Sequence, residues 1–208
     1  MLSGDRLQQA IRKKFEIWAG FLDPDPAHAK RIAHTSLAIY DGLVSCGVMG
    51  STVIHEVDVR DLLSIAAIVH EVGRAVGKKK HHKRTVRMLN KLDVPPGWTA
   101  EHLRMIGLAA RYHRGALPFA HPAYARLARS KQRMVALLGG ILRLAEAVES
   151  AGQKADGELL LERRNGYLVL HAQKQPSSTK GVERIAARRH LLETACGIPI
   201  LVSATASP

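Results

Sequence analysis

The chain has 208 residues, which is enough for one well-buried domain with a small appendage but short for two full domains. Hydrophobic residues make up 46% of it, which argues against a disordered chain, and the formal net charge of +13 predicts polyanions as partners. Because it has only Cys46 and Cys196, and no apolar run of the ~20 residues that span a bilayer, we expect a cytoplasmic protein without disulfides, cysteine-type zinc or membrane insertion.

Helical patterns separated by Pro and Gly fill the first three quarters of the chain. The first helix is expected over about residues 5–19, and it is amphipathic, unlike the core of a signal peptide. The segment Asp23-Pro24-Asp25-Pro26 then supplies a turn and the N-terminal cap of a second helix, which extends to about Ser45. On this second helix we expect His28 on the buried stripe and His34 on the solvent side.

The central stretch places two titratable residues at the end of an apolar segment. The unbroken apolar run from Leu62 to Val69 indicates a segment buried on all sides, and His70 and Glu71 follow it directly. Burying an imidazole against a carboxylate is costly unless something binds them. The stretch therefore indicates a metal site or a phosphate-handling site.

Three later segments contribute further candidates. A helix over about residues 85–92 is expected to turn His82 inward, although a one-residue shift in register would turn His81 inward instead. A helix over about residues 99–113 places His113 at its inner end. In a long apolar helix over about residues 131–151, Glu146 lies on an apolar face, either as a metal ligand or in a buried ion pair.

The pattern changes to β structure from Asp156. Asn165-Gly166 between two apolar segments favours a type I′ β-hairpin, and a polar loop, a basic helix over 179–196 and a strand over 198–202 follow. We therefore predict a mainly α protein, with a helical domain at residues 1–152 and a small α+β appendage at residues 153–208 packed on it.

The candidate ligands come from separate helices, and we expect them to converge. Together they make a nitrogen and oxygen site for a divalent ion (Mn, Fe, Ni, Zn or Mg), with His70 and Glu71 at the catalytic centre. Such an ion would activate water and polarise a phosphoryl oxygen, which predicts metal-assisted hydrolysis. Taken singly, a histidine at a helix end is more often a core or capping group than a metal ligand, so the prediction depends on the whole set. The predicted metal ligands are His28, His70, Glu71, His82, His113 and Glu146.

Basic residues flank these positions in the sequence. Guanidinium and ammonium groups bind phosphate oxygens, so we predict phosphate binding, with a solvated basic loop as the alternative. Arginines such as Arg184 and Arg188 lie away from the site in sequence, where they would form a second basic face for nucleic acid or a partner protein. The predicted phosphate-binding residues are Arg74, Lys78, Lys79, Lys80, Arg111 and Arg114.

The order His…His-Glu…His…His…Glu resembles the HD superfamily of metal-dependent phosphohydrolases. Five segments resemble more closely, in order and spacing, the C-terminal HD-like domain of Ppx/GppA exopolyphosphatases and pentaphosphate phosphatases: HAKRIAHTSLAIYDGL, AAIVHEVGRAV, HHKRTVRML, AARYHRGALP and LLGGILRLAEAVES. The likeness covers nearly the whole chain from Asp25 onward. It implies an HD-domain helical bundle in which Glu71 and Glu146 stand where HD domains typically have Asp.

The resemblance also implies a function. We expect an HD-type phosphohydrolase acting on a phosphate ester or anhydride, with a nucleotide, an alarmone or polyphosphate as substrate. No stretch resembles the Gly-rich phosphate loops of the family's catalytic unit, so the alternative is a non-catalytic regulatory module that binds polyphosphate or alarmone. A weaker alternative is an RNA-binding or protein-interaction domain that uses the basic tail. The resemblance further implies a homodimer.

Overall fold

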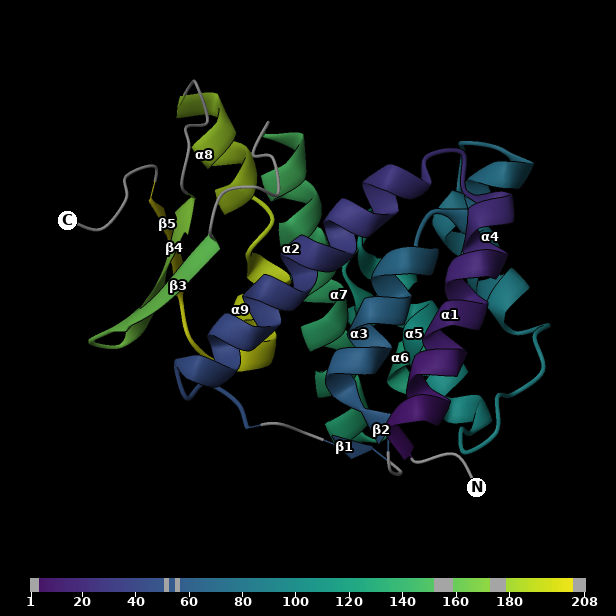
Figure 1. Cartoon of the computed structure of the whole chain (residues 1–208). Helices are drawn as coiled ribbons and strands as arrows, with labels where there is room; N and C mark the ends of the chain where they lie inside the picture. The colour runs from purple at the N-terminus through teal and green to yellow at the C-terminus, as the bar shows by residue number, and fades with distance from the viewer. Residues whose placement is uncertain (1–3, 51–52, 55–56, 152–158, 173–178, 204–208) are drawn as a thin grey trace.

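The structure, a computed structural model, describes residues 4–50, 53–54, 57–151, 159–172 and 179–203. Helices dominate this part of the chain, and a three-stranded sheet lies at its C-terminal end (Figure 1). The expected mainly α fold with a small β-containing addition is therefore confirmed. The helices are α1 (Gly4–Leu22), α2 (Pro26–Ser45), α3 (Val59–Val69), η1 (Val72–Val76), α4 (His81–Leu89), α5 (Ala100–Tyr112), η2 (Pro118–Ala120), α6 (Pro122–Ala125), α7 (Arg129–Ser150), α8 (Thr179–Ala186) and α9 (His190–Cys196). The strands are β1 (Val53–Ile54), β2 (Val57–Asp58), β3 (Leu159–Arg164), β4 (Tyr167–Ala172) and β5 (Ile200–Ser203).

Helix α3 is the centre of the helical body. Every residue from Leu62 to Val69 is buried, and α1, α2, α5 and α7 all pack against this helix. Asp58 caps it, because its Oδ1 accepts a hydrogen bond of 2.8 Å from the amide of Arg60. A helix with no polar face is stable only when neighbours cover it on all sides, so the end of α3 lies deep in the protein.

The C-terminal sheet has the order β3-β4-β5, with β3 antiparallel and β5 parallel to β4. Gly166 supplies the positive φ of 84° that the β3–β4 turn requires. Figure 1 shows the sheet and α8 on one side of the molecule, beyond α2 and α7, while α1 and α4 lie on the opposite side. The expected boundary between residues 152 and 153 lies outside the described residues, and the division into two domains stays a prediction.

Helix α9 attaches the C-terminal part to the helical body. A Cβ added at Gly140 of α7 would lie 2.7 Å from the amide nitrogen of Leu192, so only glycine permits this approach of the two helices. The single helix expected over 179–196 is instead two helices, because the chain leaves the helix between Ala186 and His190. The short pair of strands β1 and β2 was not expected either. None of the helices in the described part of the chain has the length and hydropathy to cross a bilayer.

Candidate metal centre

Two histidines enter the site from the C-terminal ends of helices. His70 follows α3 and His113 follows α5, and both side chains are at most 1% exposed. Nδ1 of His70 lies 2.6 Å from the carbonyl oxygen of Ala67, and Nδ1 of His113 lies 2.5 Å from that of Ala110. A carbonyl oxygen only accepts, so both Nδ1 atoms carry the proton. This tautomer turns Nε2 of each ring toward the site, as in histidines that bind metals.

His81 is the third histidine of the site. Its Nδ1 donates to the carbonyl oxygen of Lys78 at 3.0 Å, and its Nε2 lies 3.5 Å from Nε2 of His113 and 3.6 Å from Oε1 of Glu71. Burial lowers the pKa of His113 well below its usual value, so the ring is neutral. The Nε2 atoms of His81 and His113 thus face each other beside the carboxylate of Glu71.

The structure turns His81 inward, whereas His82 was the residue expected to face inward. Helix α4 begins at His81, and its buried residues are His81, Thr85 and Leu89, four positions apart. His82 therefore lies on the next face, half-buried, with its ring centroid 5.6 Å from that of His81. The alternative register considered above is the observed one.

Glu146 accepts hydrogen bonds from two histidines. Nε2 of His70 lies 2.8 Å and Nε2 of His28 lies 3.0 Å from its Oε1, and Arg114 approaches Oε2 at 3.3 Å. Burial raises the pKa of Glu146, but the hydrogen bonds from the two histidines outweigh it and hold the pKa well below its usual range. The hydrogen bond to Glu146 likewise raises the pKa of His28, against the effect of burial. Both ring nitrogens of His70 therefore face oxygen atoms, Nδ1 the carbonyl of Ala67 and Nε2 the carboxylate of Glu146.

Four side chains form a set with the spacing of metal ligands. His70, Glu71, His113 and Glu146 each offer a ligand atom, and these atoms all lie within 4.8 Å of one another. All four residues are buried. Two imidazole nitrogens with their Nδ1 protons fixed, together with two carboxylates, suit a divalent transition metal. The residues thus fit the divalent ion that the sequence predicts, and the two imidazoles favour Mn, Fe, Ni or Zn over Mg.

Of the predicted residues outside this set, His28, Arg74 and Arg114 contact its carboxylates. The side chain of His28 is 19% exposed and contacts the set through Glu146. Arg74 forms an ion pair with Glu71, and Arg111 lies 5.9 Å from the centroid of the Tyr112 ring. The side chains of Lys78, Lys79 and Lys80 are exposed on the loop before α4.

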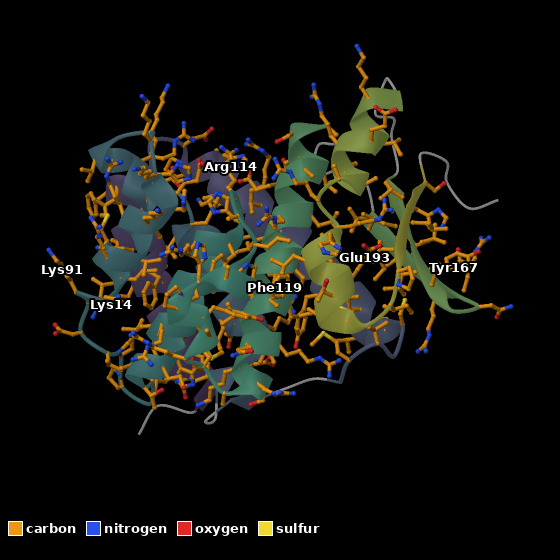
Figure 2. The ribbon with its side chains drawn as sticks, turned by 180° about the vertical axis from the view of Figure 1, so that it is seen from behind. Lys14, Lys91, Arg114, Phe119, Tyr167 and Glu193 are labelled. Carbon is orange, nitrogen blue, oxygen red and sulfur yellow. The ribbon has the colours of Figure 1, made fainter. Side chains whose placement is uncertain are left out.

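A basic cavity beside the set contains residues that the sequence did not assign to the site. Its volume is about 400 Å³, and its lining includes His113 and Glu146. It is also lined by Arg114, Arg143, Arg184 and Arg188. Figure 2 shows Arg114 toward the upper end of the molecule, where α8 also lies. The sequence offers one indication that Arg143 belongs to the site, because it is a charged residue three positions before Glu146 in an otherwise apolar segment.

Comparison with known proteins identifies the family. The model of Ppx/GppA phosphatase, domain III, matches residues 9–175, a stretch that contains every residue of the candidate set. A search of curated proteins found no match. Because the matched stretch is well over half of the 208 residues, the chain belongs to the Ppx/GppA phosphatase domain III family.

Proposed function

We propose that the chain is a metal-dependent phosphohydrolase of the HD type that acts on a phosphate ester or anhydride. The observation that carries the proposal is the convergence of His70, Glu71, His113 and Glu146, with both imidazoles fixed in the tautomer that presents Nε2. A purely structural cluster does not need four buried titratable groups, since burying them without a partner costs free energy. The family relation to phosphatases supports the same conclusion.

Each residue has a role in this proposal. The four side chains of the set would hold a divalent ion, which supplies a water of lowered pKa and polarises a phosphoryl oxygen. His28, which contacts Glu146, and His81, which lies beside Glu71 and His113, would extend the set to a second ion. Arg74 and Arg114 present guanidinium groups beside the two carboxylates, where they would bind phosphoryl oxygens and orient the substrate.

The test is the metal content of protein purified without chelators, measured by elemental analysis. We expect near-stoichiometric Mn, Fe, Ni or Zn in the wild type and loss of the metal in the His70→Ala/Glu71→Ala double variant and in His113→Gln. His34→Ala is the matched control, because His34 is an exposed histidine on α2, away from the set. Circular dichroism checks that the variants fold. Full metal content in folded set variants would overturn the proposal.

Turnover separates the enzyme from a binding module. The metal-loaded wild type should release phosphate from a nucleotide, an alarmone or polyphosphate, and removing the metal should abolish the release. The second candidate function is a non-catalytic module that captures these polyanions, and the basic cavity favours it. That module would bind polyphosphate in a salt-sensitive way without metal or turnover. The cytoplasmic location and the homodimer stay predictions.

A further inference from the structure

We propose that the outer face of α4 and α5 binds the sugar-phosphate backbone of a nucleic-acid duplex. The inference goes beyond the proposed function and does not depend on a bound metal. The residues that carry it are exposed or half-buried cations of the two helices and of the turn after α4. We call them the α4–α5 basic face, and they are Lys83, Arg87, Lys91, Arg104 and Arg111.

The segment around α4 carries positive charge without an acidic counterpart. Residues 77–92 contain seven lysines and arginines and no aspartate or glutamate. Within the part of the chain that the structure describes, no cation of the basic face forms an ion pair. Helix α1 differs, because both Arg12 and Lys13 pair with Glu16. Like charges one turn apart destabilise a helix, so α4 should gain stability when an anion covers this face.

The packing of α4 on α5 joins these cations into one surface. A Cβ at Gly107 would lie 3.8 Å from the backbone of α4, so this side of α5 faces α4. Arg104 and Arg111 lie three residues before and four residues after Gly107, on the same side of the helix, and therefore border α4. Burial lowers the pKa of His121, and the charges of Arg111 and Lys83 lower it further. Cations of both helices thus act on the same region.

The basic face points away from the candidate metal centre. His81 lies on the buried side of α4, whereas Lys83 and Arg87 are exposed. Figure 1 shows α4 on the side of the molecule opposite the sheet and α8, and Figure 2 shows Lys91 at the outer edge, pointing away from the body. Substitutions on this face should therefore leave the buried ligands in place.

The arrangement of the cations favours a duplex over linear polyphosphate. They lie on two neighbouring helices, and the axes of packed helices are about 8–10 Å apart. The grooves of B-DNA, which the two phosphate strands border, are ~6–12 Å wide. Cations on two helices therefore match two phosphate strands, whereas a linear chain of phosphates needs only one row of cations.

The composition of the face also disfavours a single strand. Single-stranded nucleic acid binds largely by stacking its bases on aromatic side chains. Residues 77–92 contain no Phe, Trp or Tyr, and Tyr112, the only such residue of α5, is fully buried. Lysine and arginine contacts to phosphate position a duplex without reading its bases, so we expect binding without sequence preference.

The experiment measures binding of a fluorescently labelled RNA duplex of roughly 20 base pairs to the full chain, by anisotropy at several salt concentrations. In Lys83→Ala/Arg87→Ala we expect the affinity at about 50 mM salt to fall on the order of 100-fold. The slope of log K against log salt should become shallower by about 2, because each lost phosphate contact releases about 0.9 fewer counterions. The control is Lys180→Ala/Arg184→Ala, which removes the same residue types, four positions apart and exposed, from α8 on the other side of the molecule. It should bind as the wild type does, and equal losses in both variants would mean a general charge effect and would overturn the proposal.

Further arms define the ligand. A DNA duplex of the same sequence that binds as tightly supports recognition of the backbone, and a preference for either duplex supports the proposal and identifies the polymer. A single strand that binds more tightly than the duplex would overturn the proposal. So would a linear polyphosphate of equal charge that binds as tightly and loses as much affinity in Lys83→Ala/Arg87→Ala.

The metal content of Lys83→Ala/Arg87→Ala separates this inference from the proposed function, and it should equal that of the wild type. A metal-free, inactive wild type that binds the duplex through these two residues would overturn the proposed function alone. An active metalloenzyme that binds no duplex at low salt would overturn this inference alone.

Discussion

Replacing Gly73 with alanine should loosen the contact between η1 and α4, which holds His81 beside Glu71 of the candidate metal set. A Cβ at this position would lie 2.3 Å from the carbonyl oxygen of His81 and 2.8 Å from the amide nitrogen of Thr85. Both are backbone atoms, so no change of rotamer relieves the overlap. Real Cβ atoms essentially never approach other atoms more closely than 3.0 Å, so η1 and α4 must move apart.

The magnitude follows from the contacts that would be disturbed. Overpacking of this kind costs about 1–3 kcal/mol, and loss of the 3.1 Å hydrogen bond from Gly73 N to Thr85 Oγ1 adds about 1 kcal/mol. We therefore expect the free energy of unfolding to fall by about 2–4 kcal/mol. Metal affinity should fall roughly 10- to 100-fold, because Glu71 precedes η1 and His81 begins α4, so the movement separates them.

The assay is urea denaturation of the chelated protein, followed by metal titration of the folded variant. Gly20→Ala is the control, because a Cβ at this position meets nothing within 4 Å. This substitution replaces a glycine near the end of α1 by a better helix former. It should be neutral or stabilising by up to about 1 kcal/mol. A Gly73→Ala protein with wild-type stability and wild-type metal affinity would refute the close packing of η1 on α4.

Three other measurements test separate parts of the structure. In chelated protein, burial lowers the pKa of His113, so its unfolded form binds more protons below about pH 6.5 and its contribution to stability falls as the pH drops. The hydrogen bond to Glu146 raises the pKa of His28, so its contribution is present below about pH 6.5 and is lost as the pH rises through the raised pKa. The measurement is the free energy of unfolding of His113→Gln and His28→Gln, relative to wild type, from urea midpoints at several pH values between about pH 5 and 8. As the pH rises, the two differences from wild type should change in opposite directions. A change in the same direction would contradict both assignments. Burial raises the pKa of Cys196 to about 11 from an ordinary 9.0, so less of the thiol is ionised at neutral pH. In a Cys46→Ser background, alkylation of Cys196 should therefore be roughly 100-fold slower in the folded protein than in the urea-unfolded protein. Equal rates would show that the thiol is not buried. Gly140→Ala should lower the free energy of unfolding by about 1–3 kcal/mol because its Cβ would meet the backbone of α9, and unchanged stability would show that α9 does not pack closely on α7.

The elements with strong local signals were predictable from the sequence. The turn before Pro26 and the Asp25 cap begin α2 where expected, and the apolar run that ends at Val69 is a buried helix. Asn165-Gly166 likewise forms the turn of the β3–β4 hairpin. These signals act between residues within a few positions of one another, so they do not depend on the rest of the fold.

The choice between His81 and His82 depended on packing. Lys80 adopts a left-handed conformation with φ of 58° just before α4, and the close approach of Gly73 sets where that helix begins. A shift of one residue rotates a helix by about 100°, so the sequence left both histidines as candidates. Contact between η1 and α4 decides the register.

Hydrophobic periodicity and capping are local properties of the chain, so the helical architecture could be predicted from the sequence. The same signals placed His70, Glu71, His113 and Glu146 at helix ends or on apolar faces. Only the tertiary structure brought the four side chains within 4.8 Å of one another and brought α8, with Arg184 and Arg188, to the same cavity. Contacts between segments more than thirty residues apart depend on how helix faces pack, and in this chain α9 against α7 sets where the C-terminal arginines lie. No local sequence pattern encodes how close these distant segments lie in the fold.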